Sequence, residues 1–262
     1  MFLSTYEDFR KWLLENNVIQ TLVHNGRGVF GSDFGSVAFS FQRYINQDLQ
    51  GVYRRLFDKQ GSVSSNKELA NNFMTAKNQY TTTDNLMKIS GFPIAYWTTE
   101  RLRNKFQTSS ALNQSADVRQ GLATADNNRF LRLWHEVNFN KIGLNIENRI
   151  ESKTSNKKWF PYNKGGDFRK WYGNQDYMIN WESDGKELNE FKPKAVIRNP
   201  QYYFKPSISW SFVSSTNFGV RYYPQGFIFD VGGSSLFPKK EIEFNSIIGF
   251  LCSNVAPALM KV

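Results

Sequence analysis

Apolar residues follow a helical spacing at the start of the chain and shorter, strand-like patterns in the segments after it. Residues 4–16 combine a capping-box spacing with an apolar face, which predicts a helix. The capping box is Ser4 with Glu7, and the predicted buried face is Phe9, Trp12 and Leu13. Residues 18–24 and 36–45 are predicted strands, and 50–58 is the predicted hairpin partner of 36–45. This helix–strand–loop–strand–strand unit is short for an independent α/β domain.

The remaining pattern mixes short helices and short strands. Residues 67–80 and 99–106 predict helices, and the Gly91 and Pro93 pair between them marks a boundary. From about 107 onward, β-type runs are separated by Gly, Asn, Pro and Ser. The predicted strands there are 140–146, 177–181, 195–199, 207–213, 220–224 and 227–231. A closing helix is predicted to begin at Asn245 or Ser246. Together these elements predict an α+β chain.

Composition adds a folded core and an excess of positive charge. The chain is 40% hydrophobic and 16% aromatic, which argues against disorder. Its net charge of +10 favours a polyanionic partner, more often nucleic acid than an acidic membrane surface. The single cysteine, Cys252, excludes an intrachain disulfide framework and lies in an apolar run typical of a buried thiol. With neither a membrane-length apolar run nor a signal-peptide pattern, we expect a cytoplasmic protein with no membrane partner.

The sequence contains no complete active site. The glycines at 26–31 follow a predicted strand but lead into another strand instead of a helix, so a plain loop is favoured over a phosphate-binding loop. His24 and His135 lack the spacing of a metal or catalytic pair, and both are expected to be structural. The acids Asp117, Asp126 and Glu136 have no spacing that fixes a metal site.

Residues 157–181, here called the basic–aromatic segment, carry the strongest functional signal. Its cations are Lys157, Lys158, Lys164, Arg169 and Lys170, and its rings are Trp159, Phe160, Tyr162, Phe168, Trp171, Tyr172 and Trp181. Cations neutralise phosphates, rings stack on bases or pack a core, and the pair Gly165–Gly166 would let the backbone approach a ligand closely. The segment predicts a nucleic-acid contact. The alternative is a solvated basic loop whose rings, Trp159, Phe160 and Trp181 above all, belong to the core.

A second candidate contact lies at residues 121–137. Asp126 with the two asparagines after it predicts a turn or a helix cap, and Arg129 and Arg132 would lie one turn apart on the following helix. The core face of that helix is predicted to be Phe130, Leu133 and Trp134. The arginines would then point outward to phosphate.

Several long strings resemble one family in the same order along the chain. They are LSTYEDFRKWLLE, TLVHNGRGVFG, GFPIAYW, GLATADNNRFLRLWHEV, KWFPYNKGGDFRKWYGN, INWESDG and RYYPQGFIFDVGGSSLF. These strings resemble the C-terminal half of large adenine-specific DNA methyltransferases, the PglX-type enzymes of BREX phage-defence systems and type IIG restriction–modification proteins. The resemblance covers nearly the whole chain. It implies a remnant of an α/β methyltransferase domain followed by a mixed α/β target-recognition domain.

The resemblance also implies how the chain divides. Residues 1–60 would be the end of the catalytic domain, 61–105 a connecting helical region, and 106–262 the target-recognition domain, as in a piece cut at both ends. In this family a glycine-rich motif binds S-adenosylmethionine and an Asn-Pro-Pro-Tyr/Phe motif holds the target adenine. Neither motif is here, and Asn199–Pro200–Gln201–Tyr202 lacks the second proline. We therefore expect no cofactor in this chain and no methylation by the chain alone.

The implied function is recognition of a double-stranded DNA sequence for N6-adenine methylation by a catalytic portion outside the chain. Two alternatives are a subunit of a split methyltransferase that is active with a partner chain, and a non-catalytic fragment that binds other defence-system proteins. The chain departs from the family at Ala125, where relatives usually have a glycine. If that position needs a positive φ, alanine costs about 1 kcal/mol or more.

Overall fold

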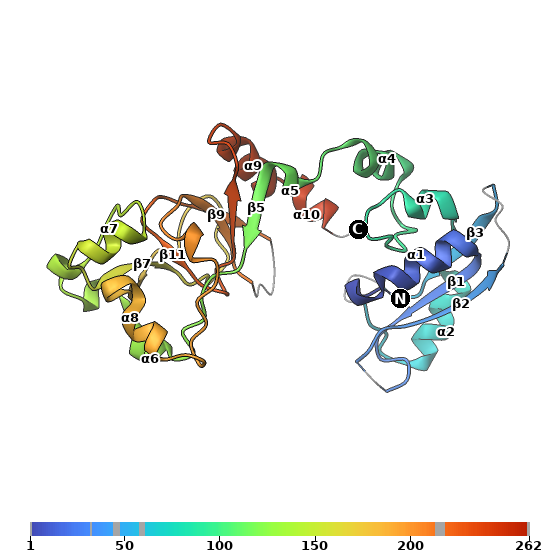
Figure 1. Ribbon diagram of the computed structural model, residues 1–262. Coiled ribbons are helices and arrows are strands. Elements are labelled where there is room, and N and C mark those ends of the chain that lie inside the picture. The colour runs from blue at the N-terminus through green and yellow to red at the C-terminus, as the bar shows by residue number, and fades with distance from the viewer. Residues whose placement is uncertain (1, 32, 44–47, 58–60, 213–217, 261–262) are drawn as a thin grey trace. The chain divides into compact units, whose positions relative to one another are not determined.

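The computed structural model describes residues 2–31, 33–43, 48–57, 61–212 and 218–260 (Figure 1). The chain forms two compact units, Met1–Ser110 and Ala111–Lys261, called here the N-terminal and C-terminal units. Helices and strands are mixed in both, which confirms the predicted α+β class. The assignment of 1–60 and 61–105 to parts of a methyltransferase stays a prediction.

The N-terminal unit is built on one four-stranded sheet of order β2-β1-β3-β4. Its elements are η1 (Ser4–Tyr6), α1 (Glu7–Asn16), β1 (Val18–Gly26), β2 (Ser36–Gln42), β3 (Gln50–Arg55), α2 (Asn66–Thr75), β4 (Gln79–Thr82), α3 (Thr83–Met87) and α4 (Glu100–Thr108). β2 pairs antiparallel with β1, and β3 pairs parallel with β1 on its other side. The predicted hairpin between 36–45 and 50–58 is therefore wrong, because β1 lies between the two strands.

Helix α1 begins and faces differently from the prediction. Leu3, not Ser4, precedes the first helical turn, and it makes no side-chain cap. Leu13 is fully buried, whereas Phe9 and Trp12 are 41% and 53% exposed. The buried Arg10 explains the rotated face, because its guanidinium donates to the carbonyls of Leu3, Gly91 and Phe92. These hydrogen bonds hold α1 in place together with the packing of its buried leucines.

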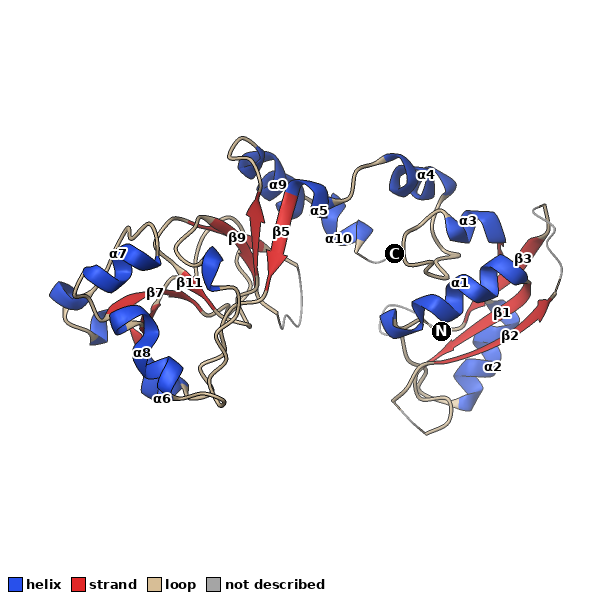
Figure 2. Cartoon of the chain, viewed as in Figure 1, coloured by secondary structure: helices blue, strands red, loops and turns tan. Residues whose placement is uncertain are grey.

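The C-terminal unit contains two four-stranded sheets, of order β10-β9-β12-β5 and β11-β7-β8-β6 (Figure 2). The strands are β5 (Ala116–Arg119), β6 (Leu131–Leu133), β7 (Trp159–Asn163), β8 (Tyr177–Asn180), β9 (Ser207–Trp210), β10 (Val220–Tyr223), β11 (Ile228–Phe229) and β12 (Ser235–Pro238). The helices are α5 (Leu112–Ser115), α6 (Asn127–Phe130), η2 (Trp134–Glu136), η3 (Phe139–Lys141), α7 (Arg149–Thr154), α8 (Glu182–Glu190), η4 (Pro200–Tyr202), α9 (Glu243–Cys252) and α10 (Val255–Leu259).

Four of the predicted strands of this unit are present in shortened form, and two are not. Residues 140–146 form the end of η3 and an irregular stretch, and 195–199 contributes an isolated bridge between Val196 and Ala123. Asn199, with φ 50°, then turns the chain into η4. The closing helix α9 begins at Glu243, two or three residues earlier than the predicted start at Asn245 or Ser246.

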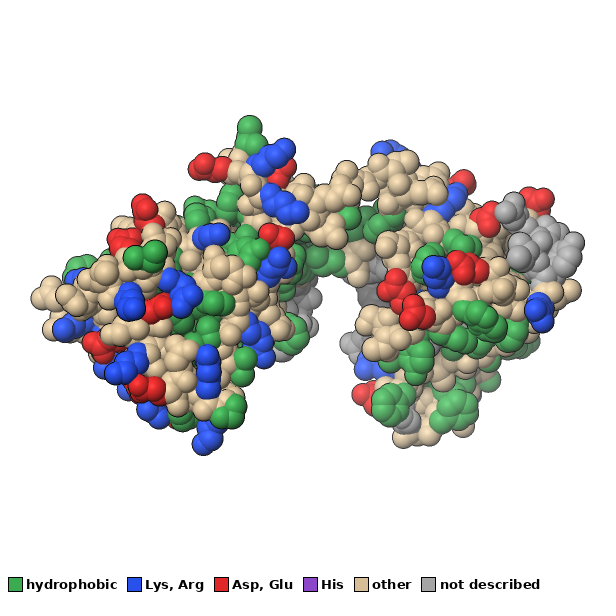
Figure 3. Space-filling view, in the orientation of Figure 1, with side chains coloured by type: hydrophobic (Ala, Val, Ile, Leu, Met, Phe, Trp, Pro, Cys, Tyr) green, Lys and Arg blue, Asp and Glu red, His purple; other side chains and the backbone are tan. Residues whose placement is uncertain are grey.

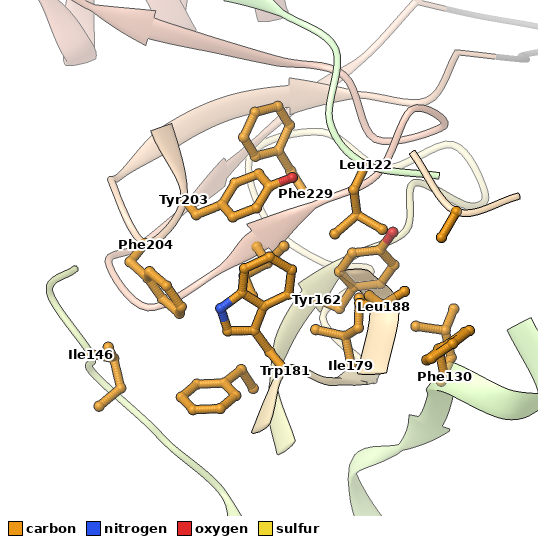
Figure 4. Close-up of a cluster of buried hydrophobic side chains, with 14 of the residues drawn as sticks. Leu122, Phe130, Ile146, Tyr162, Ile179, Trp181, Leu188, Tyr203, Phe204 and Phe229 are labelled. Atoms are coloured by element: carbon orange, nitrogen blue, oxygen red, sulfur yellow. The ribbon is translucent and has the colours of Figure 1, made fainter. Parts of the chain in front are cut away.

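Two cores hold the C-terminal unit together. Trp181 and Tyr162 lie within the larger one, beside the sheet that contains β7 and β8 (Figure 4), and Phe160 belongs to the same core. In the smaller core, α9 packs on the other sheet, and Cys252 is the buried free thiol that the sequence predicts. Among the described residues, no helix has the length and apolar character needed to span a membrane.

Candidate nucleic-acid interface

The basic–aromatic segment connects the two sheets of the C-terminal unit. Its ends are the antiparallel pair β7 and β8, with Phe160 opposite Ile179. The stretch between them reaches the other sheet, where the Trp171 N–H donates to the carbonyl of Val220 at 2.8 Å. The Trp171 carbonyl accepts from the Tyr222 N–H at 2.9 Å. These two hydrogen bonds fix the middle of the segment beside β10.

This path divides the aromatic rings into two groups. Phe160, Tyr162 and Trp181 are fully buried, as the core alternative predicts for two of them. Phe168, Trp171 and Tyr172 are 40%, 54% and 67% exposed. Exposed rings of this size are available for stacking, and they all lie in the stretch that crosses between the sheets.

Lys164 lies in an ion pair inside the unit. Its ammonium is 2.8 Å from an Asp230 carboxylate oxygen, and the Asp230 side chain is only 3% exposed. That carboxylate also accepts from the Tyr162 hydroxyl at 2.6 Å and from the Gly232 N–H at 2.6 Å. Burial first, and then the Asp230 charge, raises the pKa of Tyr162 well above its ordinary value, so the hydroxyl stays a donor. A phosphate contact by Lys164 would compete with this ion pair.

Lys170 is bound to the end of a helix. Its ammonium donates to the carbonyl of Cys252, the last residue of α9, at 2.8 Å. A cation at this end offsets the negative end of the helix dipole. Lys170 therefore joins the segment to α9, and its charge is already partly neutralised.

Gly165 and Gly166 have positive φ values of 84° and 113°. A Cβ on Gly165 would lie 2.5 Å from the carbonyl oxygen of Gly232, so this glycine allows close approach of the chain to itself. Gly166 is exposed, and its carbonyl accepts a hydrogen bond from the Ser211 hydroxyl.

Four other cations lie on the surface of the segment and beside it. Lys158 and Arg132 both place their charge 5.8 Å from the ring centre of the half-buried Trp159. Lys157 donates to the Asn140 carbonyl at 2.7 Å, and Lys158 is 3.9 Å from the Glu182 carboxylate. Arg169 is exposed, and its guanidinium reaches the carbonyl of the preceding residue at 3.3 Å.

The second candidate region differs from its prediction. Asp126 caps α6 by accepting from the Arg129 N–H at 3.0 Å, which confirms the predicted cap. The helix ends at Phe130, so Arg132 lies on strand β6 and the two arginines are not one helical turn apart. Arg129 is bound to the Glu187 carboxylate at 2.8 Å. Phe130 is buried as predicted, but Trp134 is 54% exposed and is not part of the core face.

Ala125 has a φ of 59°, a left-handed conformation that favours glycine. The positive φ is the condition under which alanine was expected to strain this turn. The cost is about 1 kcal/mol, and Asp126 still forms its cap directly after it.

Residues 26–31 do not fit a cofactor loop. The Arg27 N–H donates to the Gly61 carbonyl at 2.7 Å, and a Cβ on Gly26 would lie 2.7 Å from the Phe57 ring. The segment leads into β2 instead of a helix, so it lacks the helix N-terminus that a phosphate-binding loop of this kind uses. No group of three or more potential metal ligands is found among the described residues.

Sequence reasoning did not find a groove of about 900 Å³ beside the basic–aromatic segment. Its lining includes Trp171, Tyr222 and Phe237 together with residues of α9. The Tyr222 and Phe244 rings meet edge to face across 5.9 Å. Only the aromatic content of the segment hinted at such a site, because the walls come from residues up to 77 positions apart.

Comparison with known proteins gives two close matches in sequence. The chain is 39% identical over 258 residues to the adenine-specific methyltransferase BrxX of Escherichia coli O9:H4 (strain HS), covering 97% of the chain. It is 36% identical over 281 residues to the adenine-specific methyltransferase PglX of Lacticaseibacillus casei (strain Zhang), covering 100% of the chain. The chain spans only 20% and 23% of the lengths of these relatives. No family model matches.

Among solved structures, the chain is similar to the type IIG restriction endonuclease BpuSI at 10% identity, over 95% of the chain and 34% of that protein. The TM-score of 0.32 is too low for this likeness to support an argument.

Proposed function

This chain is a homologue of about one fifth of the adenine-specific methyltransferases BrxX and PglX, and from this relationship we propose that it recognises double-stranded DNA for such an enzyme. It would hold a DNA sequence so that an adenine can be methylated at N6 by a catalytic portion. The proposed setting is a restriction–modification or phage-defence system.

The observation that carries this proposal is the exposed stretch of the basic–aromatic segment. Arg169 lies there between the exposed rings of Phe168 and Tyr172, on a backbone fixed to β10. A guanidinium can neutralise a phosphate, and nearby rings can pack against sugar or base. The net charge of +10 would attract the chain to the negatively charged DNA before any direct contact forms. Figure 3 shows Lys and Arg side chains spread over the visible face of the C-terminal unit, with Asp and Glu between them.

The contacts of each cation suggest a division of roles. Arg169 and the cations around Trp159, namely Lys157, Lys158 and Arg132, are proposed to bind phosphates. Arg129 and Lys164 lie 2.8 Å from carboxylates and Lys170 donates to the carbonyl at the end of α9, so these three are proposed to position the interface. The four proposed phosphate ligands also contact the unit, Arg132, Lys157 and Arg169 through carbonyls and Lys158 at 3.9 Å from Glu182, and a phosphate would replace these contacts. Gly165 and Gly166 shape the backbone that joins these two sets of residues.

Catalysis is proposed to lie outside the chain. The sequence has no Asn-Pro-Pro-Tyr/Phe motif, and Gly26 and Gly28 are packed against their own chain. Asn199–Pro200–Gln201–Tyr202 partly resembles that motif, but its Asn199 amide donates to the Gln120 carbonyl at 2.9 Å. The residues described above are therefore proposed to bind and orient DNA and not to bind S-adenosylmethionine.

A binding series on labelled duplex DNA at rising salt tests the proposal. The full chain is expected to bind at low salt and to lose affinity as salt rises, because each neutralised phosphate releases counterions. An absence of duplex binding, or an affinity that salt does not change, would refute it. Incubation of the chain alone with DNA and S-adenosylmethionine should give no methylated adenine.

A further inference from the structure

The groove beside the basic–aromatic segment has the dimensions of a small-ligand site. Its volume of about 900 Å³ falls within the range of pockets that hold a nucleotide-sized molecule. Trp171 and Tyr222, 54% and 39% exposed, line it, and α9 contributes Phe244 and Ile248. Surface rings of this size are held in water only at a cost in solvation free energy, which a planar ligand would remove.

The backbone of Trp171 is held in place beside the groove. Its φ of 71° is unusual for a bulky residue, and such strain persists only where surrounding contacts impose it. The two hydrogen bonds to β10 impose it from one side. From the other side, the neighbouring Lys170 is bound to the end of α9, the helix that forms the opposite wall. The backbone of Trp171 is thus fixed to β10, and that of its neighbour is tied to α9.

The groups at the rim indicate what kind of ligand would enter. Lys205 supplies a positive charge, while Glu241 and Asn245 supply hydrogen-bond acceptors and an amide donor. A groove lined mostly by apolar and aromatic side chains, with one lysine, one glutamate and one amide, can hold a nucleobase while Lys205 meets its phosphate. A base that is stacked and paired inside a duplex cannot reach such a slot, so the base must be unstacked.

We propose that the groove between Trp171, Tyr222 and α9 binds one unstacked base of the DNA. This inference rests on the proposed function and deepens it. The base stacks on the Trp171 ring, the Tyr222 ring closes the slot, and Lys205 meets the adjoining phosphate. The groove stabilises a strand in which one nucleotide has left the stack.

The test compares three DNA probes with the full chain: a perfect duplex, the same duplex with one bulged 2-aminopurine, and a single strand with that base. We expect binding to the bulged duplex to be about tenfold tighter than to the perfect duplex, the effect of stacking one base on an aromatic side chain. The 2-aminopurine fluorescence should fall on binding, because the base stacks on Trp171. The single strand shows whether an unpaired base is enough for binding without a flanking duplex. Its 2-aminopurine fluorescence should also fall on binding.

Variants assign the effect to the groove. Trp171→Ala and Tyr222→Ala should each bring the ratio of bulged to perfect duplex affinity close to one, whereas Tyr222→Phe should retain it. Trp134→Ala is the matched control, since Trp134 is also 54% exposed but lies in η2. The control should leave the ratio unchanged.

The outcomes separate this inference from the proposed function. Equal affinity for bulged and perfect duplex, or equal loss in the Trp134→Ala control, overturns the base site and leaves duplex recognition standing. A chain that binds none of the probes refutes the proposed function itself. The 2-aminopurine fluorescence with the unmodified chain tests the base site even if a groove variant fails to fold. Quenching supports the site, and unchanged fluorescence contradicts it.

Discussion

Replacing Lys164 with methionine separates a structural role from a DNA contact at the residue where the two compete most directly. The change keeps most of the side-chain length but removes the charge that pairs with the buried Asp230. Losing one partner of a buried ion pair costs about 3–5 kcal/mol. The Lys164 side chain is 28% exposed, so we expect the lower end, about 3 kcal/mol. For a unit of this size, this corresponds to a melting temperature lower by about 6–12 °C.

The assay is urea unfolding followed by tryptophan fluorescence, with duplex binding measured under conditions where the variant is folded. Asp230→Asn should cost less, about 1–2 kcal/mol, because the amide oxygen can still accept from Tyr162 and Lys164 can turn to solvent. The double variant should lose less stability than the two single losses added together. The reasoning fails if Lys164→Met unfolds within about 0.5 kcal/mol of the unmodified chain and binds DNA more weakly.

Three further changes test other parts of the structure. Ala125→Gly should raise the free energy of unfolding by about 0.5–1 kcal/mol, because the φ of 59° is left-handed, and an unchanged value in a urea titration would contradict this. Burial, followed by the Arg55 charge, lowers the pKa of His24 to about 4. The neutral ring therefore stabilises the fold above pH of about 6.5, and this contribution is lost as the pH falls toward 4. After allowance for solvent exposure the loss is about 1–2 kcal/mol, and His24→Phe should flatten that part of the pH–stability curve. Lys170→Met removes the cation at the Cys252 carbonyl and should cost about 1 kcal/mol, measured as a shift in the thermal midpoint.

Local patterns predicted elements well and pairings poorly. The runs at 177–181 and 220–224 form strands because alternation and β-branched or aromatic residues are properties of a few neighbouring positions. The pairing of β3 with β1 instead of β2 depends on which strand is central, and no short window contains that information. The same limit applies to α1, whose face is set by Arg10 binding carbonyls 81 and 82 positions away.

The candidate interface shows the same division. The sequence singles out the basic–aromatic segment because its cations and rings are close together along the chain. It does not indicate which of them are engaged, because Lys164 meets a carboxylate 66 positions away and Lys170 a carbonyl 82 positions away. The buried or exposed state of each ring likewise follows from the crossing between two sheets. The groove at Trp171 needs the sheet and α9 together, so it has no signature in the sequence.

The central claim is that the exposed stretch around Arg169 contacts the phosphates of duplex DNA. The most direct measurement is the slope of log affinity against log salt for Arg169→Ala, compared with the unmodified chain and with Arg101→Ala, an exposed arginine of α4 in the N-terminal unit. One lost phosphate contact should reduce the magnitude of the slope by about 0.9 and weaken binding to every duplex sequence alike. Arg101→Ala should match the unmodified chain. An unchanged slope and affinity for Arg169→Ala, or an equal loss for both variants, would contradict the account.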